Sequence, residues 1–254
     1  MRQFKLLVLT VAALLSINGL AQASTIDINS LINKGTITAD SLTGSLSAQV
    51  NGNTVDLGAN AKANYNSETG RTFASASGTG TNGSTFTVSL NGDPDPEIIW
   101  TASMTAGTTD TTYLFTFIQP FIGGPYGTLH SDVSGSTTAS NSGGAGVQVT
   151  NIGLQVGTDP GTIYDHLVNG SCSTGGGSQL CPAFADLNIN PLNPPTDSIG
   201  NMKVVFGATV SAFDAATFNG KLTLDGQVPE PGTVILLGSG LIALAWLRRK
   251  QTNS

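Results

Sequence analysis

Residues 85–104 read TFTVSLNGDPDPEIIWTASM, and this stretch decides the fold. Thr85 to Leu90 alternates polar and apolar residues, and residues 98–104 repeat the pattern with Ile, Trp, Ala and Met at every second position. A period of two places these apolar side chains on one face, so each segment is predicted to be a half-buried β-strand. Asn91-Gly92-Asp93-Pro94 between them has the composition of a turn.

Other strand patterns follow along the chain. Ser45 to Val50 and Asn53 to Leu57 flank Asn51-Gly52, a dipeptide that favours a type I′ hairpin turn. Residues 113–118 are apolar on both faces, which predicts a central strand. Further strands are expected at residues 61–65, 72–76, 147–156, 184–189, 203–213 and 221–224. About ten short strands predict an all-β protein, an antiparallel β-sandwich or jelly roll. A β-helix is the alternative, but no fixed repeat supports it.

The composition limits the function classes. Of 254 residues, 39% are hydrophobic and 10% are charged, and 32 are glycine, which suits one domain of short strands and turns. The net charge of −6 does not provide the basic surface that nucleic-acid binding requires. Two cysteines and two histidines offer few metal ligands, so we expect no cofactor.

The N-terminus has the pattern of a secretory signal peptide. Arg2 and Lys5 precede an apolar run at residues 6–17, and Ala21-Gln22-Ala23 provides the small residues that signal peptidase accepts. We therefore expect a signal helix at residues 1–23, removed by signal peptidase, and a mature chain that begins at Ser24.

The C-terminus has three parts in a fixed order. Val228, Pro229, Glu230 and Pro231 come first, and the prolines keep this segment extended and accessible. An uncharged apolar segment at residues 232–247 follows and predicts a single transmembrane helix that is slightly short for a bilayer. The basic cluster that comes next predicts a cytoplasmic C-terminus; it consists of Arg248, Arg249 and Lys250.

This tail resembles the PEP-CTERM sorting signal of Gram-negative bacteria, a type of tail that has also been labelled ice-binding. The resemblance implies that residues 228–231 are the motif recognised by a membrane-embedded exosortase, which cuts near it and releases or transfers the body. Residues 248–250 would be the membrane-retention signal. An uncut C-terminal anchor is the alternative. The expected organisation is thus a signal peptide at 1–23, an exported domain at 24–227, a sorting signal at 228–250 and a tail at 251–254.

The exported domain is acidic, with five basic residues against fifteen acidic ones and a net charge of −10. It contains both cysteines, Cys172 and Cys181, which enclose eight residues rich in glycine and serine. In an oxidising compartment, such a pair predicts a disulfide. Asp93, Asp95 and Glu97 occupy alternate positions and form a weak candidate calcium site, because an extended backbone would point them to one side.

Other motif matches carry little weight. Gly78-x-Gly80-x-x-Gly83 fits the dinucleotide-binding pattern, but a strand and not a helix is predicted after it. His130-Ser131-Asp132 and Asp165-His166 lack a Gly-x-Ser-x-Gly elbow and are interpreted as surface loop residues. The Thr-x-Thr pairs have no common period and do not predict an ice-binding array; they are Thr36/Thr38, Thr79/Thr81 and Thr85/Thr87. We therefore expect no catalytic residues.

These features favour a non-enzymatic protein of the cell surface or extracellular matrix. The body is expected in the periplasm while the tail holds it at the inner membrane, and outside the cell after processing. Exopolysaccharide and biofilm are the implied surroundings, because the resembled family is associated with them. One rival is a carbohydrate-binding or ice-binding sandwich in which exposed Trp100 or Tyr126 stacks on sugar rings. The other is a secreted hydrolase, which needs two carboxylates facing each other in a cleft.

Overall fold

The computed structural model describes residues 28–124, 126–138, 148–159, 163–173, 178–184 and 199–226. The predicted signal peptide at residues 1–23, the predicted transmembrane helix at 232–247 and the rest of the sorting signal lie outside these residues. Among the described residues, no helix has the length and apolar character needed to cross a bilayer.

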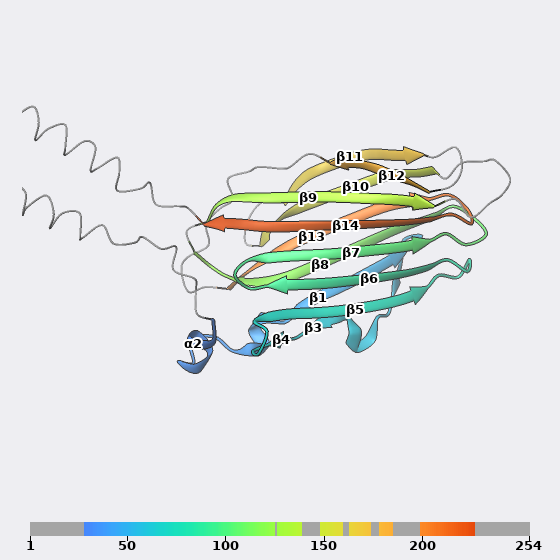
Figure 1. The fold of residues 1–254 in the computed structure, drawn as a ribbon. Helices are drawn as coiled ribbons and strands as arrows, with labels where there is room; N and C mark the ends of the chain where they lie inside the picture. Colours follow the sequence, from blue (N-terminus) through green and yellow to red (C-terminus); the bar gives the residue numbers. More distant parts are fainter. Residues whose placement is uncertain are drawn as a thin grey trace, which may run out of the picture. The chain divides into compact units, whose positions relative to one another are not determined.

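Two sheets of seven strands make up the described body, and Figure 1 shows them as two layers. Sheet A contains β1 (Gly44–Val50), β2 (Asn53–Val55), β3 (Lys62–Ala63), β8 (Thr111–Ile122), β10 (Gln148–Asp159), β11 (Ile163–Ser173) and β13 (Ile199–Val210). Sheet B contains β4 (Tyr65–Asn66), β5 (Arg71–Thr79), β6 (Thr85–Asp93), β7 (Glu97–Thr105), β9 (Tyr126–Thr138), β12 (Ser178–Phe184) and β14 (Ala215–Gly226). Three short helices precede or interrupt the early strands; they are α2 (Ile28–Asn33), η1 (Ala39–Leu42) and η2 (Gly58–Ala61).

Every strand pairing is antiparallel. Sheet A has the order β11-β10-β13-β8-β1-β2, with β3 also paired to β1, and sheet B has the order β12-β9-β14-β7-β6-β5-β4. The chain changes sheets seven times among the described strands: between β3 and β4, β7 and β8, β8 and β9, β9 and β10, β11 and β12, β12 and β13, and β13 and β14. The predicted antiparallel β-sandwich is therefore confirmed.

The core fills the space between the sheets with every second side chain of each long strand. Trp100 of β7 is central: its ring centroid lies 5.3 Å from that of Phe117 on β8 and 5.0 Å from that of Phe206 on β13. Phe206 in turn lies 4.9 Å from Phe218 of β14. Aromatic side chains of both sheets thus interlock, which stabilises the sandwich through their large buried area.

Most of the predicted strands are present. The 51–52 turn joins β1 to β2, with φ of +50° at Asn51 and +77° at Gly52, as a type I′ turn requires. Strand β8 lies between β13 and β1, so its predicted central position is confirmed. After Gly78-x-Gly80-x-x-Gly83, the chain continues as strand β6 and not as a helix.

Three sequence predictions need correction. The expected turn at 91–94 is wrong, since β6 continues to Asp93 and the turn occupies residues 94–96. The single strand expected at 61–65 is two strands, because the chain leaves sheet A after Ala63 and enters sheet B at Tyr65. Strands β9 and β11 were not predicted at all. In β9, serine, threonine and glycine residues obscure the buried Leu129 and Val133. The strand predicted at 184–189 lies, except for Phe184, outside the described residues.

Candidate functional site

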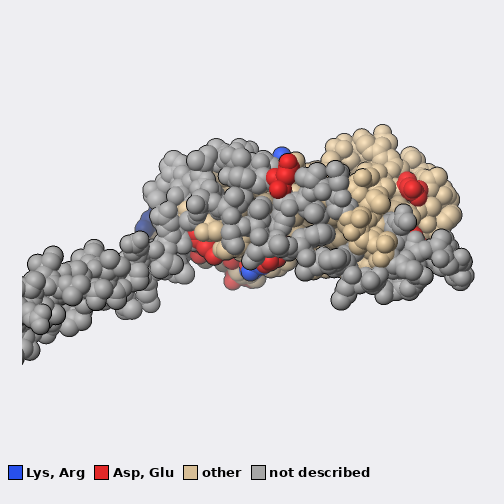
Figure 2. All heavy atoms as spheres, turned by 90° about the horizontal axis from the view of Figure 1, so that it is seen from above, with Lys and Arg blue, Asp and Glu red and all other residues tan. Residues whose placement is uncertain are grey.

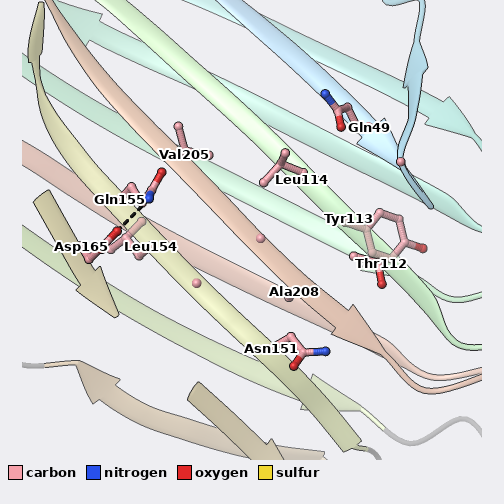
Figure 3. Close-up of a pocket in the computed structure, with 13 residues that line it drawn as sticks. Gln49, Thr112, Tyr113, Leu114, Asn151, Leu154, Gln155, Asp165, Val205 and Ala208 are labelled. Atoms are coloured by element: carbon pink, nitrogen blue, oxygen red, sulfur yellow. Dashed lines mark hydrogen bonds between the residues drawn. The ribbon is translucent and has the colours of Figure 1, made fainter. Parts of the chain in front are cut away.

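A groove of about 520 Å³ crosses the outer face of sheet A. Its lining comes from β1, β8, β13, β10 and β11 and from the β1–β2 turn (Figure 3). The size falls within the range of about 300 to 1,000 Å³ that is typical of small-molecule sites.

Two glycines form the floor of the groove. Gly153 of β10 and Gly207 of β13 are direct partners across the two strands, and Gly207 is in turn paired with Leu114 of β8. These positions face outward, so the missing side chains leave a hollow between neighbouring strands. Leu114, which is 37% exposed, and Val205 give the floor an apolar surface.

Polar side chains form the walls. On one side, Gln155 Nε2 donates a hydrogen bond of 2.7 Å to Asp165 Oδ1, joining β10 to β11. On the other side, Asn151 Nδ2 donates to Thr209 Oγ1 at 3.3 Å, and the hydroxyls of Thr209 and Thr112 are 2.9 Å apart. Figure 3 shows Gln49 beyond Leu114, at the β1 end of the groove.

Asn151 owes its place to a distorted backbone. The register of β10 shifts between Thr150 and Gly153, and Asn151 has a φ of +52°. Such irregularities change the direction of a side chain and are frequent at functional sites. Here the amide of Asn151 becomes part of the groove lining.

The groove carries little charge. Asp165 is the one charged residue among the thirteen residues that line it. In the view of Figure 2, most of the visible described surface is uncharged, with small separate groups of acidic and basic side chains. Neutral hydrogen-bonding groups therefore dominate the site.

Sequence reasoning missed this groove, although a signal was present. Both Gly153 and Gly207 fall inside segments predicted to be strands, at residues 147–156 and 203–213. A glycine inside a strand often marks a bulge or the close approach of a ligand. That the two glycines are partners depends on the pairing of β10 with β13, which the sequence does not reveal.

The calcium candidate has a different geometry from the one expected. Asp93 and Glu97 face each other across the β6–β7 hairpin and do not follow one another along an extended segment. Arg71 Nη2 donates to Glu97 Oε1 at 2.6 Å, and its Nη1 lies 3.5 Å from Asp93 Oδ2. Lys221 Nζ lies 2.7 Å from Glu97 Oε2. The carboxylates of Asp93 and Glu97 thus already face basic side chains, and the described residues contain no cluster of ligands suited to a metal ion.

This charged group shifts two pKa values. Burial raises the pKa of Glu97, but hydrogen bonds from Lys221 and Arg71 outweigh it, so the net shift is downward. Partial desolvation and the neighbouring Asp93 raise the pKa of Asp95. Asp93 and Glu97 face each other across the hairpin, but they do not line the groove on sheet A.

The aromatic residues named as sugar platforms are part of the core. Trp100 is 1% exposed and Tyr126 is 5% exposed, so the expectation that they stack on sugars at the surface is wrong. Tyr126 donates its hydroxyl to the carbonyl oxygen of Ile122 at 2.6 Å, and burial raises its pKa. Trp100 follows the inward period of β7, which explains its burial. Tyr126 is out of phase with the buried Leu129 and Val133 of β9, and a register shift between β9 and β14 separates it from them.

The histidine motifs lie on strands and not on loops. His130, Ser131 and Asp132 follow one another on β9, where Ser131 faces the core, and Asp165 and His166 lie on β11. His130 Nε2 is 2.9 Å from Asp225 Oδ2 on β14, so it pairs with a residue outside its own motif. Asp165 lines the groove on sheet A.

The outer face of sheet B carries an array of hydroxyl groups, which we call the hydroxyl face. Register pairs align small hydroxyl side chains across β5, β6, β7, β14 and β9; one such row is Ser77, Thr87, Ser103, Thr217 and Ser136. Ser103 and Thr217 are 3.1 Å apart at their hydroxyl oxygens. The array forms from residues on neighbouring strands. It therefore leaves no repeat along the chain by which the sequence could have predicted it.

The predicted cysteine pair lies on two edge strands. Cys172 is on β11, packs against the core and is not a free thiol. Cys181 is on β12, but its side chain lies outside the described side chains. The Cys172–Cys181 disulfide therefore stays a prediction.

Comparison with solved structures finds carbohydrate-binding modules. TmCBM61 in complex with beta-1,4-galactotriose is 12% identical, with 55% of this chain and 88% of that chain covered and a TM-score of 0.24. The family 11 module from Clostridium thermocellum, in complex with a beta-1,3-1,4-mixed-linked tetrasaccharide, is 13% identical, with 71% and 96% covered and a TM-score of 0.23. The N-terminal cellulose-binding domain of Cellulomonas fimi beta-1,4-glucanase C is 14% identical, with 52% and 80% covered and a TM-score of 0.22. At such low similarity, these matches carry no argument about a ligand.

Comparison with curated protein sequences gives no match. The family model of the PEP-CTERM protein-sorting motif matches residues 227–250, the segment in which the sequence pattern placed the sorting signal. The motif supports an exported protein that an exosortase processes at the membrane. The chain therefore carries a PEP-CTERM protein-sorting motif at its C-terminus.

Proposed function

We propose that the protein is a non-enzymatic component of the cell surface or extracellular matrix. Signal peptidase removes residues 1–23, the tail holds the body at the inner membrane, and an exosortase then transfers or releases the body. The observation that carries this proposal is the match of residues 227–250 to the sorting motif. The described body supports it, because a sandwich with few charged groups and an aromatic core suits a structural or binding module.

The decisive experiment changes the recognition motif. A variant with Pro229→Ala, Glu230→Ala and Pro231→Ala is expected to accumulate in the inner membrane, since the exosortase no longer recognises its tail. Gln251→Ala with Thr252→Ala, beyond the basic cluster, is the control and should reach the surface normally. Unchanged release of the motif variant would remove the sorting proposal.

Intact mass of the protein from its native host tests the processing itself. We expect a surface species that begins at Ser24 and ends between Val228 and Pro231. A surface species that still contains residues 248–254 would contradict cleavage and would indicate a permanent anchor.

A carbohydrate-binding module is the second candidate. The observation that favours it is the groove on sheet A, whose walls consist of amide and hydroxyl groups above an apolar floor. A hydrolase is supported less well, since this groove contains one carboxylate among its lining residues and glycoside hydrolysis normally requires two.

A further inference from the structure

We propose that the groove on the outer face of sheet A binds a neutral polysaccharide chain. The inference rests on the proposed function, because a protein of the cell surface or matrix is surrounded by polysaccharide. It identifies a site and a ligand class that the sorting motif leaves open.

The first argument is the pair of floor glycines. Glycine in the interior of a strand is destabilising relative to alanine, because its backbone loses more conformational freedom on folding. Gly153 and Gly207 occur on neighbouring strands in spite of this destabilisation, at positions that are direct partners. The outer face offers an explanation: a Cβ atom added to Gly207 would lie 3.3 Å from Leu114 Cδ1, a tight contact, so glycine leaves the hollow beside Leu114 open.

The second argument is the chemistry of the walls. Amide groups of Gln49, Asn151 and Gln155 both donate and accept hydrogen bonds, as the hydroxyl groups of sugars do. The hydrogen bond from Gln155 to Asp165 holds both side chains in place and leaves the second carboxylate oxygen as an acceptor. Leu114 and Val205 offer an apolar surface to the C–H faces of a sugar ring. Sites with this combination of apolar floor and few placed polar groups are typical of specific small-ligand recognition.

The third argument is charge. Among the described residues that line the groove, none is basic and Asp165 is acidic. The exported domain also has an excess of ten acidic residues, fifteen against five basic ones. Both features repel an anionic chain, so a neutral polysaccharide is favoured over an acidic one.

The fourth argument is length. The row Gly153, Gly207, Leu114 and Gln49 crosses β10, β13, β8 and β1. With neighbouring strands about 4.8 Å apart, this row extends over about 14 Å. The groove therefore accommodates a stretch of linked sugars and not only a single ring.

The test measures binding of the full chain, purified in detergent, to immobilised extracellular polysaccharide of the host. Anion exchange first separates this material into a neutral and an anionic fraction. The unchanged protein is expected to bind the neutral fraction and to show at least tenfold weaker affinity for the anionic one. Failure to bind the neutral fraction, or preference for the anionic one, would overturn the inference.

Three variants locate the binding surface. Gly207→Leu fills the groove and should reduce affinity at least tenfold, whereas Ser47→Leu, on the same face but outside the lining, should change it less than twofold. Asn151→Gly removes only the amide, because glycine adopts the same positive φ, and should reduce affinity about fivefold. If circular dichroism shows that Gly207→Leu does not fold, the Asn151→Gly variant still tests the groove.

Two further variants test the alternatives. Asp165→Asn replaces a carboxylate acceptor in the groove wall by an amide and should weaken binding of the neutral fraction about threefold. A loss of more than tenfold confined to this variant would overturn the inference, because it would point to a bound cation instead. Thr87→Leu alters the hydroxyl face; if it abolishes binding while Gly207→Leu does not, the groove is not the site. None of these outcomes depends on where the protein is located, so the motif variant tests the proposed function separately.

Discussion

At the scale of single residues, the packing of Trp100 depends on a glycine. A Cβ atom added to Gly220 on β14 would overlap the Trp100 ring, so the ring or the backbone would have to move. The same addition at Gly207 meets nothing closer than 3.3 Å. Both positions are strand glycines, but only Gly220 lies directly against a core side chain.

This difference predicts opposite tolerance to alanine. Gly220→Ala should lower the free energy of unfolding by about 2 to 3 kcal/mol, since overpacking a core displaces well-packed side chains. Gly207→Ala is the matched control and should change it by less than about 1 kcal/mol. Urea unfolding followed by tryptophan fluorescence measures both. Equal effects of the two variants would contradict the close contact between Gly220 and Trp100.

For Trp100, the sequence predicted burial more reliably than function. The period of two placed Trp100 on the inward face of its strand, and the structure confirms that position. The same residue was also considered as an exposed sugar platform, which its burial excludes. The sequence does not show which face of a strand is covered until the second sheet is known, so a large aromatic fits both interpretations.

At the scale of elements, the β1–β2 hairpin was the clearest prediction, because two adjacent residues need a positive φ and few residue pairs accept it. Asn51 also accepts a hydrogen bond at its Oδ1 from the backbone N–H of Thr112 at 2.9 Å, which connects the turn to β8. The turn is thus held by its own conformation and by a neighbouring strand.

Asn51→Ala should therefore destabilise the protein by about 1 to 2 kcal/mol. Alanine is less favourable at this φ, and the hydrogen bond to Thr112 is lost. Thermal unfolding measures the effect. Asn53→Ala, two residues along the chain at an exposed position, should change the melting temperature only slightly; a comparable loss in both variants would contradict the special role of Asn51.

The charged group on sheet B connects four strands, because Arg71, Asp93, Glu97 and Lys221 lie on β5, β6, β7 and β14. Glu97 has a lowered pKa, so it stabilises the folded protein above the pKa of an unfolded glutamate, about 4.3, and this contribution is lost as the pH falls through the lowered value. Asp95 has a raised pKa and acts in the opposite direction, since its protonation at low pH favours the folded state.

Two substitutions should separate these contributions. Glu97→Gln is expected to cost about 1.5 kcal/mol at pH 7, as hydrogen bonds to a charged group are lost, and to make stability depend less on pH below about pH 5. Asp95→Asn should make the decline toward acid steeper. Urea unfolding at pH 7, 5 and 3.5 measures how the free energy of unfolding of each variant changes with pH. Parallel curves for the two variants would contradict the assigned pKa directions.

At the scale of the whole molecule, the sequence predicted the sandwich but not its strand order. Alternation identifies strands one by one, whereas β8, β13 and β10 become neighbours through segments that lie far apart in the chain. The groove depends on this order, because its floor combines Gly153, Gly207 and Leu114 from three strands. The sorting tail was predictable for the opposite reason: its motif, apolar segment and basic end are contiguous.

The strand order indicates what the predicted disulfide would connect. Cys172 lies on β11 and Cys181 on β12, the terminal strands of sheet A and sheet B at the same side of their strand orders. These two strands contact each other across the sandwich. A bond between them would join the two sheets at an edge, where no other strand continues either sheet in the described body.

Reduction is therefore expected to lower the free energy of unfolding by about 2 to 3 kcal/mol, the amount that closing a short loop provides. The effect should appear first as increased hydrogen exchange in β11 and β12, because the bond acts at that edge. Urea unfolding with and without dithiothreitol measures the total. In a Cys172→Ala, Cys181→Ala variant, the reductant should have no effect. Two thiols that react with iodoacetamide in the untreated exported protein would show that the sheets are joined at this edge by packing alone.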